Sequence, residues 1–545
     1  MTKGPDGGLP MDAHHLTLLS GEEKLKVPII PGFSVRELLD QTPLRVRAAC
    51  GGSGRCASCR VRLLAGEAPP LSRSEREKLP QTLQEEGWRL ACQLRPQQSI
   101  ILQLAQPAPP SPWRSLPPHE LAWLRGRLPH RRNTPLAVAV DLGTTHLRLS
   151  LWQCQGGYRI ASRWGANPQE IDGSDLLNRL AHATQSPERA RQLADAVQNA
   201  LLEAILDMLQ RDVGGGRSHL AQIGRLVIVG NTAMLALLSE QGIDTLLQPE
   251  QWQQAIDCQP LDHNRWQQSW QLPHARIELI PPIAGFIGSD LLAGILATDL
   301  HNGPPGSLLL DFGTNLEMAL WDGKQLHVTS LPGGPAFIEA SSADWPGKIE
   351  RLSEIPVTEP ELDSSATTLS GYAPAGLIEA VAWLCREKHL KPSGRFALPV
   401  DRQGYRLHPA LSASAVTAAA IDGLQRAKAA CAAALQLLLE EAHLSWSQLH
   451  TLHLGGTLGQ RLPLEAARQL GLLPPLPDAA IRKVANSALT GCEKVLFAAE
   501  GNELFAPLIA FLHPLNLATV PRFDDLFLAH LPLRPIPLDP LPAIG

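Results

Sequence analysis

The sequence predicts a small α+β domain at the N-terminus, followed by a larger, internally duplicated α/β domain. The chain has 545 residues, and single hydrophobic cores stop growing near roughly 250 to 300 residues, so several domains are expected. Four cysteines with cluster-like spacing lie near the N-terminus. Two similar strand-turn-strand segments lie further along, about 170 residues apart, and such self-similarity is the signature of a duplication.

Composition and charge exclude several classes of protein. Apolar residues make up 44% and charged residues 19% of the chain, a globular rather than a disordered composition. The formal net charge is only -5, so we expect neither a nucleic-acid partner nor binding to an anionic membrane. Met1 to His15 lacks the charged start and apolar run of a signal peptide. No apolar run approaches a membrane span of about 20 residues. We therefore expect a soluble, cytoplasmic protein.

The chain divides into four parts by its pattern. Residues 12–106 alternate short strand-like segments with one helix-like segment, VRELLDQ, which predicts a compact α+β module. Residues 107–134 are rich in proline and arginine and are predicted to be a solvated linker with one short helix at His119 to Arg125. Strand-like and helix-like segments then alternate, which favours an α/β architecture in two halves, 135–304 and 305–545.

The cysteines near the N-terminus have the spacing of an iron-sulfur site. Cys50, Cys56 and Cys59 lie in the string CGGSGRCASC, and Cys92 follows after a gap of 32 residues. Plant-type [2Fe-2S] sites have the spacing Cys-x4-Cys-x2-Cys with a distant fourth cysteine. The first gap here is one residue longer, which resembles the adrenodoxin-type variant. Glycines between the first two cysteines permit the unusual backbone angles that a loop around a cluster requires.

Two alternatives remain open for these thiols. Zinc also takes four cysteines, although zinc sites usually have two short pairs and Cys92 has no near partner in sequence. Unligated thiols are the second alternative. The other five cysteines are scattered singly, and we expect them to act as small hydrophobic residues in the core.

The two similar segments are LAVAVDLGTTHLRLSLW, from Leu136 to Trp152, and SLLLDFGTNLEMALWDG, from Ser307 to Gly323. In each, an apolar strand enters an Asp-x-Gly-Thr turn. Such a turn presents backbone N–H groups and hydroxyls to phosphate oxygens, and a carboxylate at the strand end can hold Mg²⁺, usually through water. The candidate residues are Asp141, Gly143, Thr144 and Thr145 in the first segment, and Asp311, Gly313, Thr314 and Asn315 in the second.

A third element supports a nucleotide site. In TLHLGGTLGQ, from Thr451 to Gln460, an apolar strand enters a turn at Gly455 and Gly456 that suits close approach of an adenosine. A single such turn is more often an ordinary hairpin or helix start. The three elements together resemble the actin-like ATPase superfamily, which includes acetate kinase, sugar kinases and heat-shock chaperone ATPases. The P-loop and dinucleotide fingerprints are absent from the sequence.

The combination of an N-terminal [2Fe-2S] module with an actin-like domain resembles the reductive activators of corrinoid enzymes. Segments similar to this family occur in the same order: NPQEIDGSDLLNRL from Asn167, VGNTAMLALL from Val229, PPIAGFIGSDLLAGIL from Pro281, LPGGPAFIEA from Leu331, LQRAKAACAAAL from Leu424, ANSALTGC from Ala485 and FDDLFLAHLPL from Phe523. The resemblance implies an α+β ferredoxin-like β-grasp domain followed by a duplicated α/β actin-like ATPase domain.

The resemblance also implies a function, with its cofactors and partners. The implied reaction is the ATP-dependent one-electron reduction of Co(II) to Co(I) in a corrinoid protein of a methyltransferase system, with a [2Fe-2S] cluster, ATP and Mg²⁺. The four cysteines would carry the electron, and Asp141 and Asp311 would position Mg²⁺ and water. The residues implied to contact phosphate are Thr144, Thr145, Thr314, Asn315, Gly333 and Gly334, and those implied to flank adenosine are Gly455 and Gly456. An upstream electron-donor protein and a homodimer are implied as well.

Three other functions remain open. A small-molecule kinase with an appended redox sensor would need a substrate pocket and a base that the sequence does not identify. An activator of radical dehydratases typically shares a [4Fe-4S] cluster between subunits, and the scattered cysteines of the ATPase domain do not suggest one. A non-enzymatic, ATP-gated partner switch is the third alternative.

Overall fold

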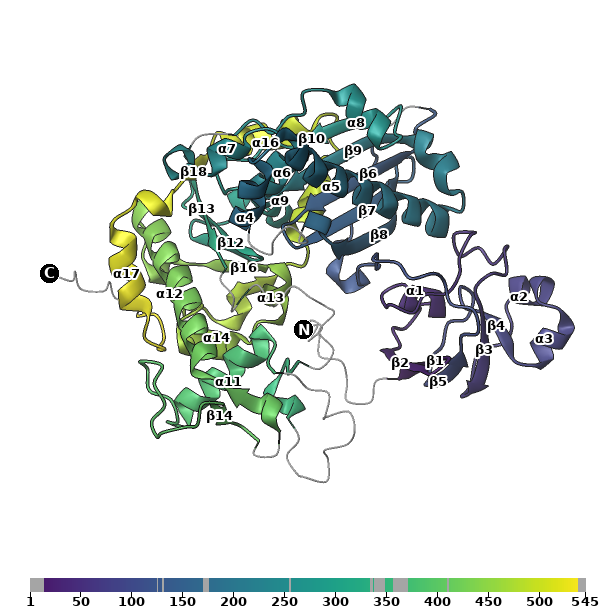
Figure 1. Ribbon diagram of the computed structural model, residues 1–545, viewed down its shortest axis with the longest axis horizontal. Helices are drawn as coiled ribbons and strands as arrows, with labels where there is room; N and C mark the ends of the chain where they lie inside the picture. The colour runs from purple at the N-terminus through teal and green to yellow at the C-terminus, as the bar shows by residue number, and fades with distance from the viewer. Residues whose placement is uncertain are drawn as a thin grey trace.

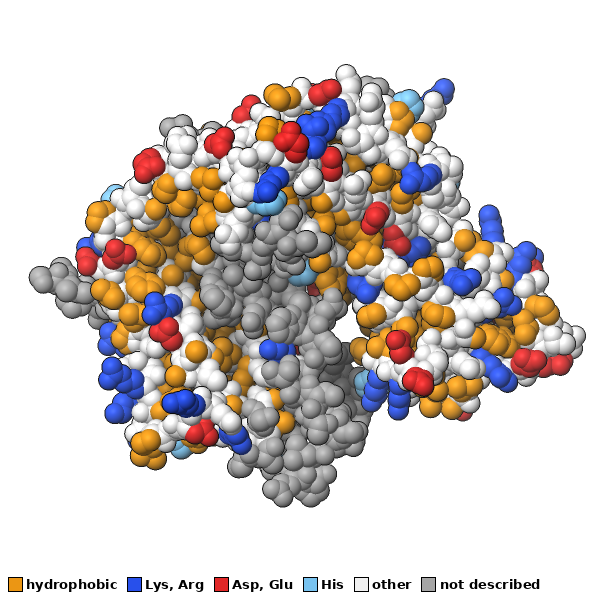
Figure 2. Space-filling view, in the orientation of Figure 1, with side chains coloured by type: hydrophobic (Ala, Val, Ile, Leu, Met, Phe, Trp, Pro, Cys, Tyr) orange, Lys and Arg blue, Asp and Glu red, His pale blue; other side chains and the backbone are white. Residues whose placement is uncertain are grey.

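The computed structural model describes residues 14–124, 126–129, 132–169, 176–253, 256–333, 337, 348–355, 371–408 and 411–537. Figure 1 shows a small N-terminal domain beside two larger halves. This arrangement confirms the predicted fold class. In the space-filling view, basic and acidic side chains are interspersed over the face shown (Figure 2), in keeping with a formal net charge of only -5.

The N-terminal domain is a β-grasp fold. Its sheet has five strands in the order β2-β1-β5-β3-β4, with β1 antiparallel to β2 and parallel to β5. The strands are β1 His15–Ser20, β2 Glu23–Pro28, β3 Arg60–Ala65, β4 Trp88–Leu90 and β5 Ile100–Gln103, and the helices are α1 Val35–Leu39, α2 Arg73–Lys78 and α3 Gln81–Glu85. Leu16 and Leu18 alternate inward along β1 and are fully buried. Ser34 and Glu37 form a capping box that starts α1.

The two larger halves repeat one strand plan. The first sheet has the order β10-β9-β6-β7-β8, and the second has the order β17-β16-β11-β12-β13-β18. In each half, an antiparallel meander of three strands is extended on one side by two parallel strands. The strands are β6 Leu136–Leu142, β7 His146–Gln153, β8 Tyr158–Ala166, β9 Ile223–Gly230, β10 Arg276–Leu279, β11 Ser307–Phe312, β12 Asn315–Trp321, β13 Leu326–Pro332, β16 Thr451–Gly455, β17 Ile481–Lys483 and β18 Leu512–Pro514. The second half also has a separate pair of short strands, β14 Tyr405–Arg406 and β15 Ala415–Val416.

Helices cover both faces of these sheets. Helices α5 and α6 pack on one face of the first sheet, and α12 packs on β12 and β13 of the second. Helices α9 and α15 pack against each other between the two sheets. The helices are α4 Leu176–Ala183, α5 Pro187–Met208, α6 Thr232–Ser239, α7 Ile243–Leu246, α8 His263–Ser269, α9 Ser289–Thr298, α11 Pro374–Arg386, α12 Ala418–Glu441, α13 Gly456–Arg461, α14 Leu464–Leu470, α15 Ser487–Val495, α16 Gly501–Ile509 and α17 Arg522–His530. Within the described ranges, no helix is long and apolar enough to cross a membrane.

A separate hydrophobic core joins the halves. It contains alanines from β6, leucines from α9 and residues of β11 and α15, among them Leu291, Leu309 and Leu489. Because α15 belongs to the second half of the chain and packs against β6 of the first half, while α9 of the first half packs against β11 of the second, the two halves exchange helices. The cleft above this core is therefore built from both halves.

The proline-rich segment after the N-terminal domain differs from the predicted solvated linker. Trp113, Leu116 and Leu128 are each at most 5% exposed. Arg114 forms an antiparallel bridge with Trp164 of β8. The expected helix at His119 to Arg125 is a single 3₁₀ turn, Pro118–Glu120, and Arg125 lies outside the described residues. The prolines set an extended path, and the apolar residues between them pack on the first half.

Candidate functional site

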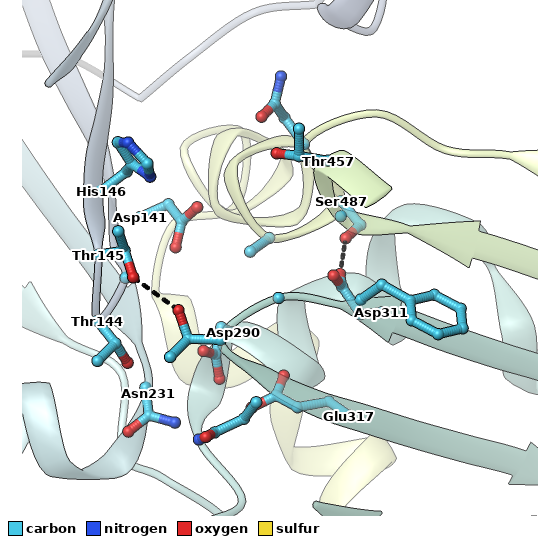
Figure 3. Close-up of a pocket in the computed structure, with 18 of the residues that line it drawn as sticks. Asp141, Thr144, Thr145, His146, Asn231, Asp290, Asp311, Glu317, Thr457 and Ser487 are labelled. Atoms are coloured by element: carbon cyan, nitrogen blue, oxygen red, sulfur yellow. Dashed lines mark hydrogen bonds between the residues drawn. The ribbon is translucent and has the colours of Figure 1, made fainter. Parts of the chain in front are cut away.

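The two Asp-x-Gly-Thr turns face each other across the cleft between the halves. Asp141 lies near the end of β6, and Asp311 lies at the equivalent place in β11. The hydroxyl oxygens of Thr145 and Thr314 are 2.7 Å apart and hydrogen-bonded. In Figure 3 the dashed line from Thr145 marks this bond. The duplicated turns thus meet at one point above a shared cavity.

Most of the residues predicted for the nucleotide line this cavity, which has a volume of about 120 Å³. They are Asp141, Gly143, Thr144, Thr145, Asp311, Gly313, Thr314, Asn315 and Gly456. Pockets that enclose ligands usually measure about 300 to 1,000 Å³. The cavity is therefore smaller than most ligand pockets, and both Thr145 and Thr314 line it. The roles of the individual residues remain predictions.

Four further glycines were predicted in the second half: Gly333, Gly334, Gly455 and Gly456, of which Gly456 lines the cavity. Gly333 donates its N–H to the carbonyl of Thr314, at 3.0 Å, and so supports the second turn. Gly455 pairs with Asp311 between β16 and β11. Gly456 has a φ of +74°, and a Cβ there would lie 2.1 Å from the carbonyl oxygen of Phe312, so only glycine fits. Gly334 lies outside the described residues.

The structure adds several residues that sequence reasoning missed. Asp290, at the start of α9, and Glu317, on β12, line the same cavity. Ser487, at the start of α15, donates a hydrogen bond to Asp311 at 2.5 Å. Figure 3 shows these side chains around one space. Other lining residues outside the prediction are His146, Arg148, Asn231, Thr457 and Asn486.

Strand register explains two of the missed residues. In the first hairpin Asp141 stands opposite Arg148, and in the second Asp311 stands opposite Glu317. Cross-strand partners share one face of a sheet, so each partner points into the cleft with its aspartate. The sequence offered part of this signal, because a hairpin around the Gly-Thr turn places a residue six or seven positions after each aspartate opposite it. Asp290 and Ser487 reach the cleft only through tertiary packing and had no comparable local signal.

Burial and mutual repulsion govern the carboxyl groups of the cleft. Burial raises the pKa of Asp141 to about 6 against the opposing effect of Arg148, whose Nη1 is 3.5 Å from a carboxylate oxygen. Burial and then the charge of Asp141 raise the pKa of Asp290 to about 8. Burial also raises the pKa of Glu317 well above its usual range. Carboxylates concentrated in this way favour a proton or a cation, and Mg²⁺ prefers oxygen ligands.

The described residues around the cleft do not form a ready-made metal site. They contain no group of three or more His, Cys, Asp or Glu side chains already placed to hold an ion. Mg²⁺ keeps several of its waters and is usually held by one or two carboxylates together with substrate phosphates. Asp141 and Asp311 therefore fit water-mediated contact to a magnesium ion that arrives with ATP.

The four predicted thiols lie in one region of the N-terminal domain. Cys50, Cys56 and Cys59 belong to the loop before β3, and Cys92 follows β4. Cys59 and Cys92 are 3% and 5% exposed. Cys50 and Cys56 are half-buried.

The cluster loop has the backbone geometry of an anion-binding loop. Gly51, Gly52 and Gly54 all have positive φ, between 60° and 77°. Despite burial, backbone N–H groups of the loop lower the pKa of Cys50 to about 7. A hydrogen bond with Cys59 is the main cause that lowers the pKa of Cys92, to about 6. The pKa of Cys59 is instead raised, by hydrogen bonding with Cys92 and by burial. The four cysteines and the glycine-rich loop fit the donor set of a [2Fe-2S] cluster.

Comparisons with known proteins agree with both sites. A model described as the 2Fe-2S iron-sulfur cluster binding domain matches residues 22–97. The model of the RACo middle region matches residues 136–303, and that of the C-terminal domain of RACo, the ASKHA domain, matches residues 306–544. The chain belongs to the RACo family of corrinoid activators.

Individual relatives align with most of the chain. The chain is 25% identical to the corrinoid activation enzyme RamQ of Eubacterium limosum, over 72% of this chain and 69% of RamQ. It is 25% identical to the Co(II) methylated amine-specific corrinoid protein reductase of Methanosarcina barkeri, over 72% of this chain and 76% of that one. A solved structure of a reductive activator for a corrinoid, iron-sulfur protein has the same fold, with a TM-score of 0.58 and 20% identity over 97% of this chain and 100% of that one. The 2Fe-2S model thus spans the four thiols, and the two RACo models span the cleft.

Proposed function

We propose that this protein reduces the cobalt of a corrinoid protein from Co(II) to Co(I) in an ATP-dependent, one-electron reaction that serves a methyltransferase system. The observation that carries the proposal is the joining of two sites in one chain. A four-thiol site lies in a domain that packs directly on the first half of an actin-like ATPase cleft. Relatives that align with 72% of the chain are named as a corrinoid activation enzyme and a corrinoid protein reductase.

ATP is required because the reaction is energetically uphill for the electron. Plant-type clusters have potentials near about -400 mV, and the Co(II)/Co(I) couple of corrinoids lies very low. A ligand that favours one conformational state by roughly 5.5 kcal/mol inverts a 1:99 equilibrium. For one electron this corresponds to roughly 240 mV at about 59 mV per tenfold change. ATP binding and hydrolysis can therefore supply the difference by changing how the cobalt substrate is bound.

The cleft residues would divide the work on ATP as follows. Asp141 and Asp311 would position Mg²⁺ and the attacking water, and the turns at Thr144, Thr145 and Thr314 would contact phosphate oxygens. Gly456 would allow close approach of the adenosine. Arg148 is the one Lys or Arg among the described residues that line the cavity, so a cation must accompany ATP to balance the carboxylates there.

The cysteines would hold the redox group. A [2Fe-2S] cluster bound by Cys50, Cys56, Cys59 and Cys92 supplies a one-electron carrier. The loop that surrounds it excludes water from Cys59 and Cys92, which are almost fully buried. Cys50 and Cys56 are more accessible, so partners would approach the cluster from their side.

Partners and location complete the proposal. The corrinoid protein is the electron acceptor, and an upstream electron-donor protein would reduce the cluster. A homodimer and a cytoplasmic location are also proposed, the latter supported by the nine cysteines, all of which are unpaired in the structure. We further propose that residues 12–106, 135–304 and 305–545 act as the three working units, with 107–134 as the connection.

The test is anaerobic absorption spectroscopy of the purified protein with a Co(II) corrinoid protein, a chemical reductant and MgATP. The expected result is Co(I), formed only with ATP. Cys59→Ser should abolish it, whereas the matched change Cys385→Ser, at a half-buried thiol outside the site, should not. Consumption of ATP on a small metabolite with no Co(I) would favour a kinase.

A further inference from the structure

A buried cluster of charges joins the N-terminal domain to the first half of the ATPase domain. We call it the interdomain ion cluster; its members are Arg36, Asp40 and Arg45 of the N-terminal domain and Arg163, Asp207, Arg211 and Asp212 of the ATPase domain. Asp40 is 3% exposed and Arg163 is 1% exposed. Buried charges are costly unless each is well paired, so this interface demands one defined arrangement.

Each aspartate of the cluster bridges the two domains. Asp40 binds Arg36 of its own domain, at 3.1 Å, and Arg211 of the other. Asp207 binds Arg45 of the N-terminal domain, at 2.8 Å, and Arg163 of its own, at 2.5 Å.

The third aspartate completes the pattern. Asp212 binds Arg36 of the N-terminal domain, and it binds Arg163 at 2.6 Å. Arg163 therefore pairs with two aspartates that each also bind the N-terminal domain. Loss of Arg163 removes one partner from both bridges at once.

The interdomain ion cluster also abuts the cysteine loop. Helix α5 continues into a π-helical turn, Leu209–Val213, which ends at Gly214. A Cβ at Gly214 would lie 3.2 Å from the Cα of Cys50, and a Cβ at Gly51 would lie 2.4 Å from the carbonyl oxygen of Asp212. A Cβ at Gly52 would lie 3.0 Å from Nη1 of Arg36. Arg36 and Asp212 of the interdomain ion cluster thus lie in contact with the loop that carries Cys50.

The same strand that carries Arg163 supports the phosphate-binding turn. Arg163 lies on β8, and Asn167 follows the end of that strand. The side-chain amide of Asn167 donates to the carbonyl of Gly143 at 3.0 Å, and its backbone N–H donates to the carbonyl of Thr145 at 2.8 Å. Four residues of strand span about 13 Å. β8 therefore links the turn at Gly143 to Thr145 directly with Arg163.

We propose that Arg163 is a positioning residue that couples the nucleotide cleft to the redox site through β8 and the interdomain ion cluster. This inference rests on the proposed function. Four arginines and three aspartates leave a formal charge of 4 - 3 = +1 in the cluster, and a positive charge beside the redox site favours the reduced, more negative form. A shift of β8 changes the ion pairs around this charge, so nucleotide binding and reduction influence each other reciprocally.

The test measures that reciprocity in the full-length, cluster-loaded protein. The midpoint potential of the cluster is titrated with and without a saturating, non-hydrolysable ATP analogue and Mg²⁺. In the wild-type protein we expect the nucleotide analogue to shift the midpoint potential by at least about 41 mV. At 59 mV per tenfold change, this shift corresponds to a fivefold difference in nucleotide affinity between the oxidised and reduced states. In Arg163→Met we expect less than a twofold difference and a lower potential without nucleotide.

A matched control separates coupling from general damage. Arg225 is also a buried arginine of the first sheet, 6% exposed and paired with Glu278 at 2.7 Å, but it lies outside the interdomain ion cluster. Arg225→Met should keep the full nucleotide-dependent shift. If the Arg163→Met protein does not retain its [2Fe-2S] cluster, the experiment uses Arg163→Lys instead. Lysine keeps the charge but cannot bridge two carboxylates as the guanidinium does, so this variant should also lose the nucleotide-dependent shift in midpoint potential.

The possible results discriminate between the two proposals. A shift in Arg163→Met and Arg163→Lys equal to that of the wild-type protein would overturn the coupling role. Absence of a shift in the wild-type protein would overturn it too, even if ATP still drives formation of Co(I). Absence of ATP-driven Co(I) in the wild-type protein would instead overturn the proposed function.

Discussion

The two halves of the ATPase domain share the order of five strands but place an arginine in one and a glutamate in the other at the same register position of their hairpins. Asp141 stands opposite Arg148 in the first half, and Asp311 stands opposite Glu317 in the second. The first turn is one residue longer, since the partners are 148 - 141 = 7 and 317 - 311 = 6 residues apart. The duplicated backbone holds two equivalent aspartates, while the partners opposite them have diverged. One half supplies positive charge to the cleft, and the other supplies a further carboxyl group.

The largest expected effect on stability comes from removing an ion pair between the two halves. Arg159 of β8 and Glu493 of α15 form a buried ion pair between them, with Glu493 1% exposed. Arg159→Met leaves that carboxyl group unpaired, which costs about 3 kcal/mol in the free energy of unfolding. Chemical denaturation measures this loss.

The control for this prediction is an ion pair on the surface of α12. Arg426→Met removes the pair with Asp422, in which both side chains are more than half exposed, and should change the free energy of unfolding by less than about 0.5 kcal/mol. Equal effects of the two substitutions would show that the ion pair of Arg159 does not hold the halves together.

The next effect distinguishes the two aspartates. Arg148 already offsets the charge of Asp141, whereas no arginine or lysine forms an ion pair with Asp311 among the described residues. We expect Asp311→Asn to lower kcat/KM for MgATP hydrolysis about 100-fold and Asp141→Asn to lower it about tenfold. Steady-state ATPase assays at saturating Mg²⁺ measure both. Equal losses would mean that the halves share the work evenly.

The third effect uses pH. Gly455 of β16 pairs with Asp311, and Val229 of β9 pairs with Asp141, so these two residues are equivalent in the two halves. Two residues earlier, His453 of β16 is therefore equivalent to Val227 of β9. Burial is the main cause that lowers the pKa of His453 from 6.5 to about 4, so the folded protein favours the neutral ring. Its stabilising contribution is complete above pH 6.5 and declines as the pH falls toward 4. The loss at pH 5 is about 2 kcal/mol.

His453→Val copies the first half and tests this account. The variant should lose less unfolding free energy than the wild-type protein between pH 8 and pH 5, by about that 2 kcal/mol. Denaturant unfolding at the two pH values measures the difference. The same acid sensitivity in both proteins would show that His453 is not responsible.

The smallest effect concerns the positive charge of the first half. Arg148→Met should raise KM for MgATP about tenfold, or about 1.4 kcal/mol, because the carboxyl groups of the cleft then repel the phosphates without opposition. Arg148→Lys should recover part of the affinity. ATPase assays at several Mg²⁺ concentrations measure KM. An unchanged KM for Arg148→Met would mean that Arg148 serves only to hold Asp141.

Local patterns in the sequence were sufficient for much of the fold and part of the site. The alternation in the first strand and the apolar strands before each Asp-x-Gly-Thr turn are set by neighbouring residues, so they could be predicted. The duplication placed Thr144 and Thr314 at equivalent positions, and the 2.7 Å hydrogen bond between Thr314 and Thr145, the residue after Thr144, shows that the turns meet. The cysteine spacing likewise marked a loop whose glycines have positive φ.

The rest depends on contacts between distant segments. Asp290 and Ser487 enter the cleft because α9 and α15 pack between the sheets, and no short motif records that packing. The interdomain ion cluster joins residues more than 150 positions apart, such as Arg45 and Asp207. The buried positions of Trp113 and Leu128 show that proline content alone does not make a segment a solvated linker.

The most direct test of the central claim, that ATP in the cleft drives an electron from the thiol-bound cluster to cobalt, is a single-turnover experiment. Protein with a prereduced cluster, free of excess reductant, is mixed anaerobically with a Co(II) corrinoid protein with and without MgATP, and cluster oxidation and Co(I) formation are followed together by absorption. The account predicts one Co(I) for each cluster oxidised, at the same rate and only with MgATP. Formation of Co(I) without cluster oxidation, or equally without ATP, would contradict it.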